Sequence, residues 1–207
     1  FEPYMTIYLT EFLNKEEVKK ISNTNEILAV KFYPTGATTN SQFGLSNLRE
    51  SYKIFELMSE LGIVLCIHGE VVDPEVDIFD REAVFIDRIL IHLMDNFPNL
   101  KIVFEHISTA DAVQFVLSRD SKIAATITPQ HLIFNRNDLL AGGIKPHRYC
   151  APILKQESDR KSLIEAATSG NSKFFLGTDS APHLVTEKET ACGCAGCYSA
   201  PHSLNIY

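Results

Sequence analysis

The segment Ile27-Leu-Ala-Val-Lys-Phe-Tyr-Pro-Thr-Gly-Ala-Thr-Thr-Asn40 decides the predicted fold. Its apolar run, residues 27–30, predicts a buried strand that ends at Lys31, and a polar loop follows over residues 34–41. A buried strand that leads a charged side chain into a loop is typical of the active-site end of a barrel enzyme. For one lysine alone, the simpler interpretation is an aliphatic stem on the core and an ammonium in solvent. The interpretation of Lys31 therefore depends on how the other strands end.

Five further apolar runs predict strands that alternate with helices. The expected strands comprise residues 5–9, 63–67, 101–104, 123–127 and 174–177. The expected helices comprise residues 14–21, 45–61, 79–97, 108–117 and 158–167. Two of them begin with capping-box chemistry, at Asn14 with Glu17 and at Ser108 with Asp111. We expect no closing helix before Tyr207.

The expected strands are apolar throughout, which predicts an α/β fold with a parallel sheet buried on both faces by helices. An open doubly wound sheet and a (β/α)8 TIM-type barrel both fit this pattern. No glycine-rich phosphate loop follows any strand, which disfavours a dinucleotide-binding sheet. Six strands with ragged ends favour an incomplete barrel of about six strand–helix units, a single partial domain over residues 1–207. The start at Phe1 and the end at Tyr207 suggest a fragment.

The composition excludes several classes of protein. The formal net charge of -7 without a basic block argues against a nucleic-acid partner. No apolar run approaches the roughly 20 residues that span a bilayer, so we expect no membrane association. Five cysteines, three of them in one short cluster, argue against a disulfide framework and for a reducing compartment. We therefore expect a cytoplasmic protein.

Four of the expected strands lead into a side chain that can bind or support a metal ion: Lys31, His68, His106 and Asp179. In a barrel the carboxyl ends of the strands converge on one mouth, so these side chains would share a cavity. Each has a simpler role when taken singly, such as a helix cap for Asp179. Their joint occurrence favours zinc, which binds imidazole and carboxylate. Lysine could join such a site only after CO2 converts its amine into an anionic carbamate.

The chain resembles the class II (bacterial-type) dihydroorotases of the amidohydrolase superfamily. The resemblance rests on six motifs in chain order: Lys31-Phe-Tyr-Pro, Cys66-Ile-His-Gly-Glu70, Phe104-Glu-His-Ile107, Ala124-Ala-Thr-Ile-Thr-Pro-Gln-His-Leu132, Leu176-Gly-Thr-Asp-Ser-Ala-Pro-His183 and Cys192-Gly-Cys-Ala-Gly-Cys197. These motifs cover nearly the whole chain and are long and varied. A member of this family interconverts N-carbamoyl-L-aspartate and L-dihydroorotate in pyrimidine biosynthesis, with two Zn²⁺ ions in a barrel.

The resemblance implies a role for each strand-end residue. Lys31 would be carboxylated on its side-chain nitrogen and bridge both zinc ions. His68 and His106 would hold the second ion, and His68 would also border the substrate. Asp179 would hold the first ion and act as general base and acid, taking a proton from the bridging hydroxide and passing it to the amide nitrogen.

The resemblance also implies a substrate site. Thr38 and Thr39 match a mobile loop that closes over the substrate, and His183 matches a contact to its carboxylate. Ala181 and Ala195 would line the same pocket, and Ala151, which replaces a leucine of the family, would contribute its backbone. The substrate is a small molecule, and we expect a homodimer.

Two elements of the family pattern are absent from this sequence. The family's opening strand carries a His-x-His-x-Arg motif, which supplies two ligands of the first zinc ion and an arginine for the substrate. An asparagine contact expected on the following strand is also missing. We therefore expect the 207 residues to be inactive alone, with the activity belonging to a full-length parent.

Other interpretations remain open at this point. A hydantoinase-like or phosphotriesterase-like hydrolase would use the same scaffold, and a catalytically dead scaffold subunit would explain the missing ligands. The thiols of 192–197 suit a soft metal, but no fourth ligand is near in sequence, so a shaped loop is the favoured interpretation. Structural roles are expected for His131 and His147, and core packing for Cys66 and Cys150.

Overall fold

Six parallel strands form one sheet in the computed structural model, which describes residues 2–38, 40–45 and 47–207. The strands are β1 (Met5–Tyr8), β2 (Ile27–Phe32), β3 (Val64–His68), β4 (Lys101–Glu105), β5 (Ile123–Ile127) and β6 (Phe174–Leu176). All six expected strands are confirmed to within about two residues. Lys31 lies inside β2, one residue before its end, and pairs with Tyr8 of β1 and Cys66 of β3.

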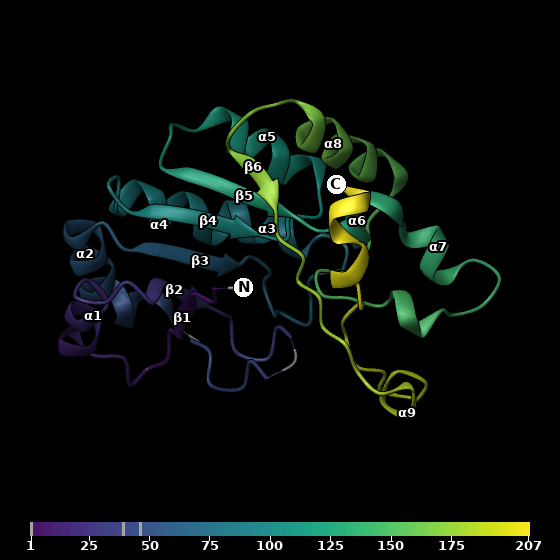
Figure 1. The fold of residues 1–207 in the computed structure, drawn as a ribbon, viewed down its shortest axis with the longest axis horizontal. Helices are drawn as coiled ribbons and strands as arrows, with labels where there is room; N and C mark the ends of the chain where they lie inside the picture. Colours follow the sequence, from purple (N-terminus) through teal and green to yellow (C-terminus); the bar gives the residue numbers. More distant parts are fainter. Residues whose placement is uncertain (1, 39, 46) are drawn as a thin grey trace.

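The strand order decides between the two architectures. Each strand pairs with the next one along the chain, in the order β1-β2-β3-β4-β5-β6. A doubly wound sheet reverses its order at a switch point, whereas a barrel does not. Because parallel crossovers are right-handed, an unreversed order places the connecting helices on one side. Figure 1 shows the strands fanned side by side with helices along their outer side, as in part of a barrel.

The connecting segments match the expected helices closely. They contain α1 (Lys15–Ile21), the 3-10 turn η1 (Leu48–Ser51), α2 (Tyr52–Leu61), α3 (Arg81–Phe85), the π-helical turn η2 (Ile86–Leu90), α4 (Ile91–Asn96), α5 (Ala110–Ser118) and α8 (Glu157–Thr168). The expected helix 79–97 is thus three consecutive elements, and the expected helix 45–61 begins at Leu48. Among the described residues, no helix is both long and apolar enough to cross a membrane.

Short elements in the loops were not predicted. They are α6 (Pro129–Ile133), α7 (Arg136–Leu140), η3 (Pro146–Arg148), α9 (Val185–Lys188), η4 (Ala200–His202) and α10 (Ser203–Ile206). The expectation that no helix closes the chain is wrong, because α10 ends one residue before Tyr207. Helices of four or five residues carry too few apolar repeats to show a period in sequence.

The core lies between the sheet and its helices. Phe85 of α3 is fully buried, and its ring stands 6.4 Å from that of Phe32 in β2 and 6.3 Å from that of Phe104 in β4. Consecutive residues of β2, β3 and β5 are buried, as predicted for strands covered on both faces, whereas the strands at the two edges of the sheet, β1 and β6, are buried on one face at most. In β6, for example, Phe174 is 8% exposed and its neighbour Phe175 is 42% exposed.

Two helix starts show which capping predictions hold. Asn14 forms the predicted capping box with Glu17 at the start of α1. The predicted box at the start of α5 is wrong, because the cap is Thr109, whose hydroxyl accepts from the backbone N–H of Ala112 at 3.1 Å. Ser108 is engaged elsewhere. Its backbone and hydroxyl donate to the carboxylate of Glu82 on α3, as do the backbone and hydroxyl of Thr109.

The buried carboxylate of Glu82 therefore ties α3 to α5, and its removal should be costly. Glu82→Leu leaves two buried backbone N–H groups without an acceptor, and we expect a loss of about 3 kcal/mol in the free energy of unfolding. Asn14→Ala, at an exposed capping box, should cost about 1 kcal/mol. Urea denaturation of both variants measures the difference, and equal losses would contradict the role of Glu82.

Candidate metal centre and substrate pocket

The predicted strand-end residues meet at one end of the sheet. His68, His106 and Asp179 line a pocket of about 200 Å³. Lys31 lines an adjoining cavity that also includes His106 and Asp179. Residues separated by up to 148 positions in sequence are therefore neighbours, because the carboxyl ends of parallel strands share one edge of the sheet.

One ring nitrogen of each of the two histidines points toward the other ring. His68 Nδ1 lies 3.1 Å from His106 Nε2, and the ring centroids are 4.6 Å apart. Two Zn–N bonds of about 2.0–2.1 Å at a tetrahedral angle would place the nitrogens roughly 3.3 Å apart. The spacing in the structure therefore fits two ligands of one ion with little movement of either ring.

Neighbouring side chains and strained backbone hold the histidines in place. His68, 1% exposed, has its Nε2 3.0 Å from the Glu70 carboxylate, which leaves Nδ1 directed at His106. His106 has a left-handed backbone (φ 44°), and its N–H donates to Thr126 Oγ1 at 2.6 Å. Burial lowers the pKa of His106 well below its ordinary value, and His68 lowers it further. His106 is therefore a neutral imidazole, the form that binds a metal ion.

His106 also carries an unpaired atom. Its Nδ1 is buried and has no hydrogen-bond partner in the described part of the chain. Such an atom is costly in a protein that gains nothing from it. The indication of a ligand comes from the other nitrogen, Nε2, which faces His68 Nδ1 across the pocket. The donor set of two imidazoles, a carboxylate and a lysine that could be carboxylated fits zinc.

Lys31 does not reach solvent. The residue is 8% exposed, which excludes the interpretation of an ammonium at the surface. Its Nζ contacts the carboxylate of Glu105, the last residue of β4, and lies 4.5 Å from the centre of the Tyr33 ring. Burial raises the pKa of Tyr33 to about 12, with Glu105 raising it further. The neutral ring of Tyr33 and the charge of Glu105 thus surround the lysine on two sides.

Asp179 stands at the open rim of the pocket. It lies three residues beyond β6 with a left-handed backbone (φ 41°), and the next helix, α9, begins only at Val185. Asp179 is therefore no helix cap. The residue is exposed, but the pocket shields its carboxyl from water, and this desolvation raises the pKa of the carboxyl. Nearby Lys31 and His68 oppose the effect. A carboxyl with a raised pKa that solvent can reach is suited to proton transfer.

The predicted substrate residues line the same pocket, except for one outside the described residues. The lining consists of Tyr33, Thr38, Asn40, His68, His106, Ala151, Asp179, Ala181, His183, Ala195 and Gly196. Thr39 is not among the residues that the structure describes. Sequence reasoning missed Tyr33, Asn40 and Gly196. Tyr33 and Asn40 lie inside the segment that opened the sequence analysis, so their position beside Lys31 and Thr38 was the available signal.

The loop that carries Thr38 is closed by its own hydrogen bonds. Pro34 and Leu45 form a bridge at its base, and the Ser41 hydroxyl donates to Thr38 O at 2.5 Å. Thr35 Oγ1 donates to Gly44 O at 2.6 Å.

The three thiols of the segment 192–197 do not converge. Cys192 is exposed, whereas Cys197 is buried in a small cluster with Cys150. Cys194 lies near His183 and Glu187, with the potential ligand atoms within 4.8 Å of one another. The loop is shaped by hydrogen bonds instead: Ala181 N–H donates to Cys197 O at 3.0 Å, and His183 Nε2 lies 3.1 Å from Ala195 O. That the loop holds no separate metal ion stays a prediction.

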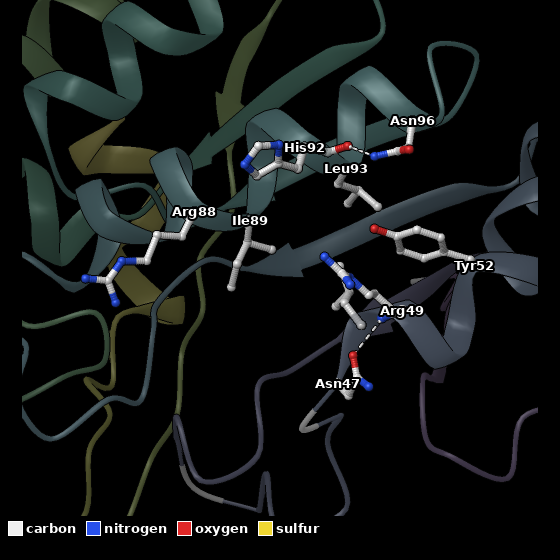
Figure 2. Close-up of a pocket in the computed structure, with 9 residues that line it drawn as sticks. Asn47, Arg49, Tyr52, Arg88, Ile89, His92, Leu93 and Asn96 are labelled. Atoms are coloured by element: carbon white, nitrogen blue, oxygen red, sulfur yellow. Dashed lines mark hydrogen bonds between the residues drawn. The ribbon is translucent and has the colours of Figure 1, made fainter.

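A second pocket lies apart from the strand ends. Figure 2 shows it between η1, α2 and the α3–α4 segment, and its lining residues are Asn47, Leu48, Arg49, Tyr52, Arg88, Ile89, His92, Leu93 and Asn96. Its arginines are exposed, and Arg88 lies 3.5 Å from Asp73. None of the predicted site residues lines it, so the pocket at the strand ends is the candidate functional site.

The chain is similar to known proteins along its whole length. A family model described as amidohydrolase matches residues 28–122. The dihydroorotases of Acinetobacter baumannii and Picosynechococcus are 56% and 57% identical over all 207 residues of this chain. The chain spans about 60% of the length of these curated relatives.

Solved structures show the same relationship. The dihydroorotase of Saccharomyces cerevisiae, in complex with 5-fluoroorotic acid, matches with a TM-score of 0.89 at 35% identity, over 98% of this chain and 59% of that one. An L-hydantoinase from Arthrobacter aurescens has a TM-score of 0.75 at 19% identity, over 98% of this chain and 50% of that one. The likeness to the L-hydantoinase, at 19% identity, shows only a shared fold.

His131 supports the pocket wall and should make stability depend on pH. Its Nδ1 and Nε2 lie 2.7 Å from Thr128 Oγ1 and 2.9 Å from Pro152 O, beside Ala151. Burial lowers its pKa to about 4, below the 6.5 of an exposed histidine. As pH falls, His131 is protonated in the unfolded chain before it is protonated in the folded one. The contribution of His131 to the free energy of unfolding is therefore complete above pH 6.5 and falls by about 3 kcal/mol towards pH 4.

Urea midpoints between pH 7 and pH 4 test this dependence. His131→Leu should be less stable at pH 7 and should show a flatter profile below pH 6.5. His147→Gln, at an exposed histidine that contacts Glu189, should keep the slope of the unmodified chain. A His131→Leu profile as steep as that of the unmodified chain would assign the acid sensitivity to other groups.

Proposed function

We propose that this chain, which matches the amidohydrolase family model over residues 28–122 and is similar to dihydroorotases over its whole length, is a member of that family and forms the metal- and substrate-binding part of a dihydroorotase. Such an enzyme would interconvert N-carbamoyl-L-aspartate and L-dihydroorotate in pyrimidine biosynthesis. One observation carries the proposal: His68, His106 and Asp179 line one pocket with the predicted substrate residues, and Lys31 lies beside it.

The proposed cofactors are two Zn²⁺ ions. His68 through Nδ1 and His106 through Nε2 would hold one ion, Asp179 would hold the other, and Lys31 would bridge both as a carbamate. When bound, the ions would polarise the substrate carbonyl and make water nucleophilic near neutral pH. Glu70 would serve the same site by fixing the ring of His68, since a ligating histidine works best when its other nitrogen is hydrogen-bonded.

The chain's own residues supply the remaining steps. Asp179, exposed and with a raised pKa, would take a proton from the attacking water as the ring opens and pass it to the leaving amide nitrogen, and the same transfer would run in reverse as the ring closes. His183, whose Nε2 lies 3.1 Å from Ala195 O, would contact the substrate carboxylate. The Thr38 loop would donate hydrogen bonds and exclude water on closing. The small side chains of Ala181 and Ala195 leave room for a six-membered ring.

The enzyme is proposed to act as a homodimer on a small-molecule substrate. The sequence holds no His-x-His-x-Arg segment, so the first ion would lack two ligands within these 207 residues. We therefore expect turnover in the complete protein and none in this chain alone. Assays with dihydroorotate, dihydrouracil and hydantoin on the complete protein separate the proposal from a hydantoinase-like activity. No turnover of any of them would favour a scaffold subunit.

Removal of the proposed bridging ligand should abolish metal binding and activity together. In the complete protein, Lys31→Ala should lose zinc, measured by atomic emission. Its activity should fall by more than about a hundredfold, because losses up to that size follow from changes to groups that only hydrogen-bond a metal ligand. Acetate or propionate should restore part of both by filling the place of the carbamate. Retention of zinc and of near-normal rates would contradict the role of Lys31.

Removal of the proposed proton carrier should act on the rate at every pH. Asp179→Ala in the complete protein should stop turnover across the whole pH range, because no other group replaces its proton transfer. The measurement is the pH profile of kcat and kcat/KM in both directions. A variant that recovered at high pH, where hydroxide is plentiful, would show that Asp179 serves a different purpose.

A further inference from the structure

The buried ammonium of Lys188 joins three segments of the pocket wall. Lys188 ends α9 and is 3% exposed. Its Nζ donates to the carbonyl oxygens of Tyr149 at 3.0 Å, Cys194 at 2.6 Å and Gly196 at 2.7 Å. An ammonium has three N–H donors, so each one has an acceptor within the protein. Lys188 is therefore fully engaged and does not reach a bound ligand itself.

The acceptors lie in the segments that shape the pocket. Gly196 lines it, as do Ala195 beside Cys194 and Ala151 two residues after Tyr149. Gly196 N–H also donates to Tyr149 O at 2.8 Å, which strengthens the same junction. Gly196 has a φ of +149°, and an added Cβ would stand 2.5 Å from Ala181 O. The wall is thus packed too tightly for its loops to move independently.

The charge of Lys188 is not balanced by an ion pair. Across residues 2–38, 40–45 and 47–207, no carboxylate oxygen lies within 4 Å of its Nζ. Burial lowers its pKa, and the three carbonyl dipoles are the groups that compensate the lost hydration. A buried cation held by neutral dipoles keeps its net charge. It therefore adds positive potential to a pocket wall.

We propose that Lys188 is a positioning residue that fixes the 149–151 and 194–197 segments as the carboxylate-binding wall of the pocket and favours an anionic substrate. The link to the ligand runs through His183, whose Nε2 contacts the carbonyl of Ala195 on the same wall. This inference rests on the proposed function for the identity of its substrate. Lys188 is neither a proposed metal ligand nor a proposed substrate contact, and its role is to hold the pocket wall in place.

The chain offers a matched control for substitution of Lys188. Lys173 also clamps carbonyl oxygens, those of Val116 at 3.0 Å and Arg119 at 2.5 Å, but it precedes β6 at the opposite end of the sheet from the pocket. Lys188→Met and Lys173→Met each remove one ammonium and keep an unbranched side chain. Any effect specific to the pocket wall should appear in the first variant alone.

Steady-state kinetics of the complete protein test the role in substrate binding. Lys188→Met should raise KM for dihydroorotate at least about tenfold and change kcat less than about threefold, because the wall binds substrate and transition state alike. Lys173→Met should leave KM unchanged. If Lys188→Met does not accumulate as folded protein, Lys188→Gln takes its place, since its amide still donates to two carbonyls, and a smaller rise in KM is expected. An unchanged KM in the folded variant overturns the proposal.

Thiol labelling tests the clamp without any activity. Cys197, 7% exposed, should react with 5,5′-dithiobis(2-nitrobenzoate) at least about tenfold faster in Lys188→Met and unchanged in Lys173→Met. The pKa of the Cys197 thiol is lowered by its hydrogen bond with Cys150 and further by Lys188. Loss of the ammonium alone would therefore slow the reaction, so faster labelling reports greater access.

The two measurements separate this inference from the proposed function. Without turnover of dihydroorotate in the unmodified complete protein, the proposed function fails, and the labelling rates still decide whether Lys188 holds the wall. With normal turnover, an unchanged KM and an unchanged labelling rate in Lys188→Met overturn the inference alone. Faster labelling with an unchanged KM overturns the role in substrate binding.

Discussion

Parallel pairing of six strands in chain order is the constraint on which the rest of this structure depends. Each strand enters the sheet from the same end, so each carboxyl end arrives at the same edge. His68 and His106, 38 positions apart in sequence, consequently stand 3.1 Å apart. The register of β3 and β4, which pairs His68 with Glu105 beside His106, brings the two histidines together. Contacts between Phe32, Phe85 and Phe104 pack the sheet against its helices.

The functional end of the molecule is built from charges that the protein has taken out of water. Lys31 is held by Glu105, Glu70 by His68, and Lys188 by three carbonyl oxygens. Each costs free energy unless it is paired or hydrogen-bonded, and their concentration at one edge of the sheet coincides with the candidate site. The left-handed backbones of His106 and Asp179 lie at the same edge and add strain there.

Sequence identity and structural similarity both point to dihydroorotases. The chain is more than half identical to curated dihydroorotases along its whole length, and its fold superposes on a dihydroorotase structure with a TM-score of 0.89. The likeness to hydantoinases is confined to the fold. The pocket wall that includes Ala181, His183 and Ala195 is held by hydrogen bonds between loops: Ala181 N–H donates to Cys197 O, and His183 Nε2 lies 3.1 Å from Ala195 O.

The sequence by itself determined the six strands, the longer helices and the identity of the strand-end residues. Apolar runs bounded by polar loops located all six strands, and the capping box at Asn14 located α1, because these signals depend on neighbours within a few residues. Only the tertiary structure chose the barrel order over a doubly wound sheet and gave the cap of α5 to Thr109, since Ser108 binds a carboxylate 26 positions away. It alone placed Tyr33, Asn40 and Gly196 in the pocket and set Lys188 on its three carbonyls. These contacts join segments distant in sequence, and no local pattern of residues encodes which carbonyl oxygens will surround a buried ammonium.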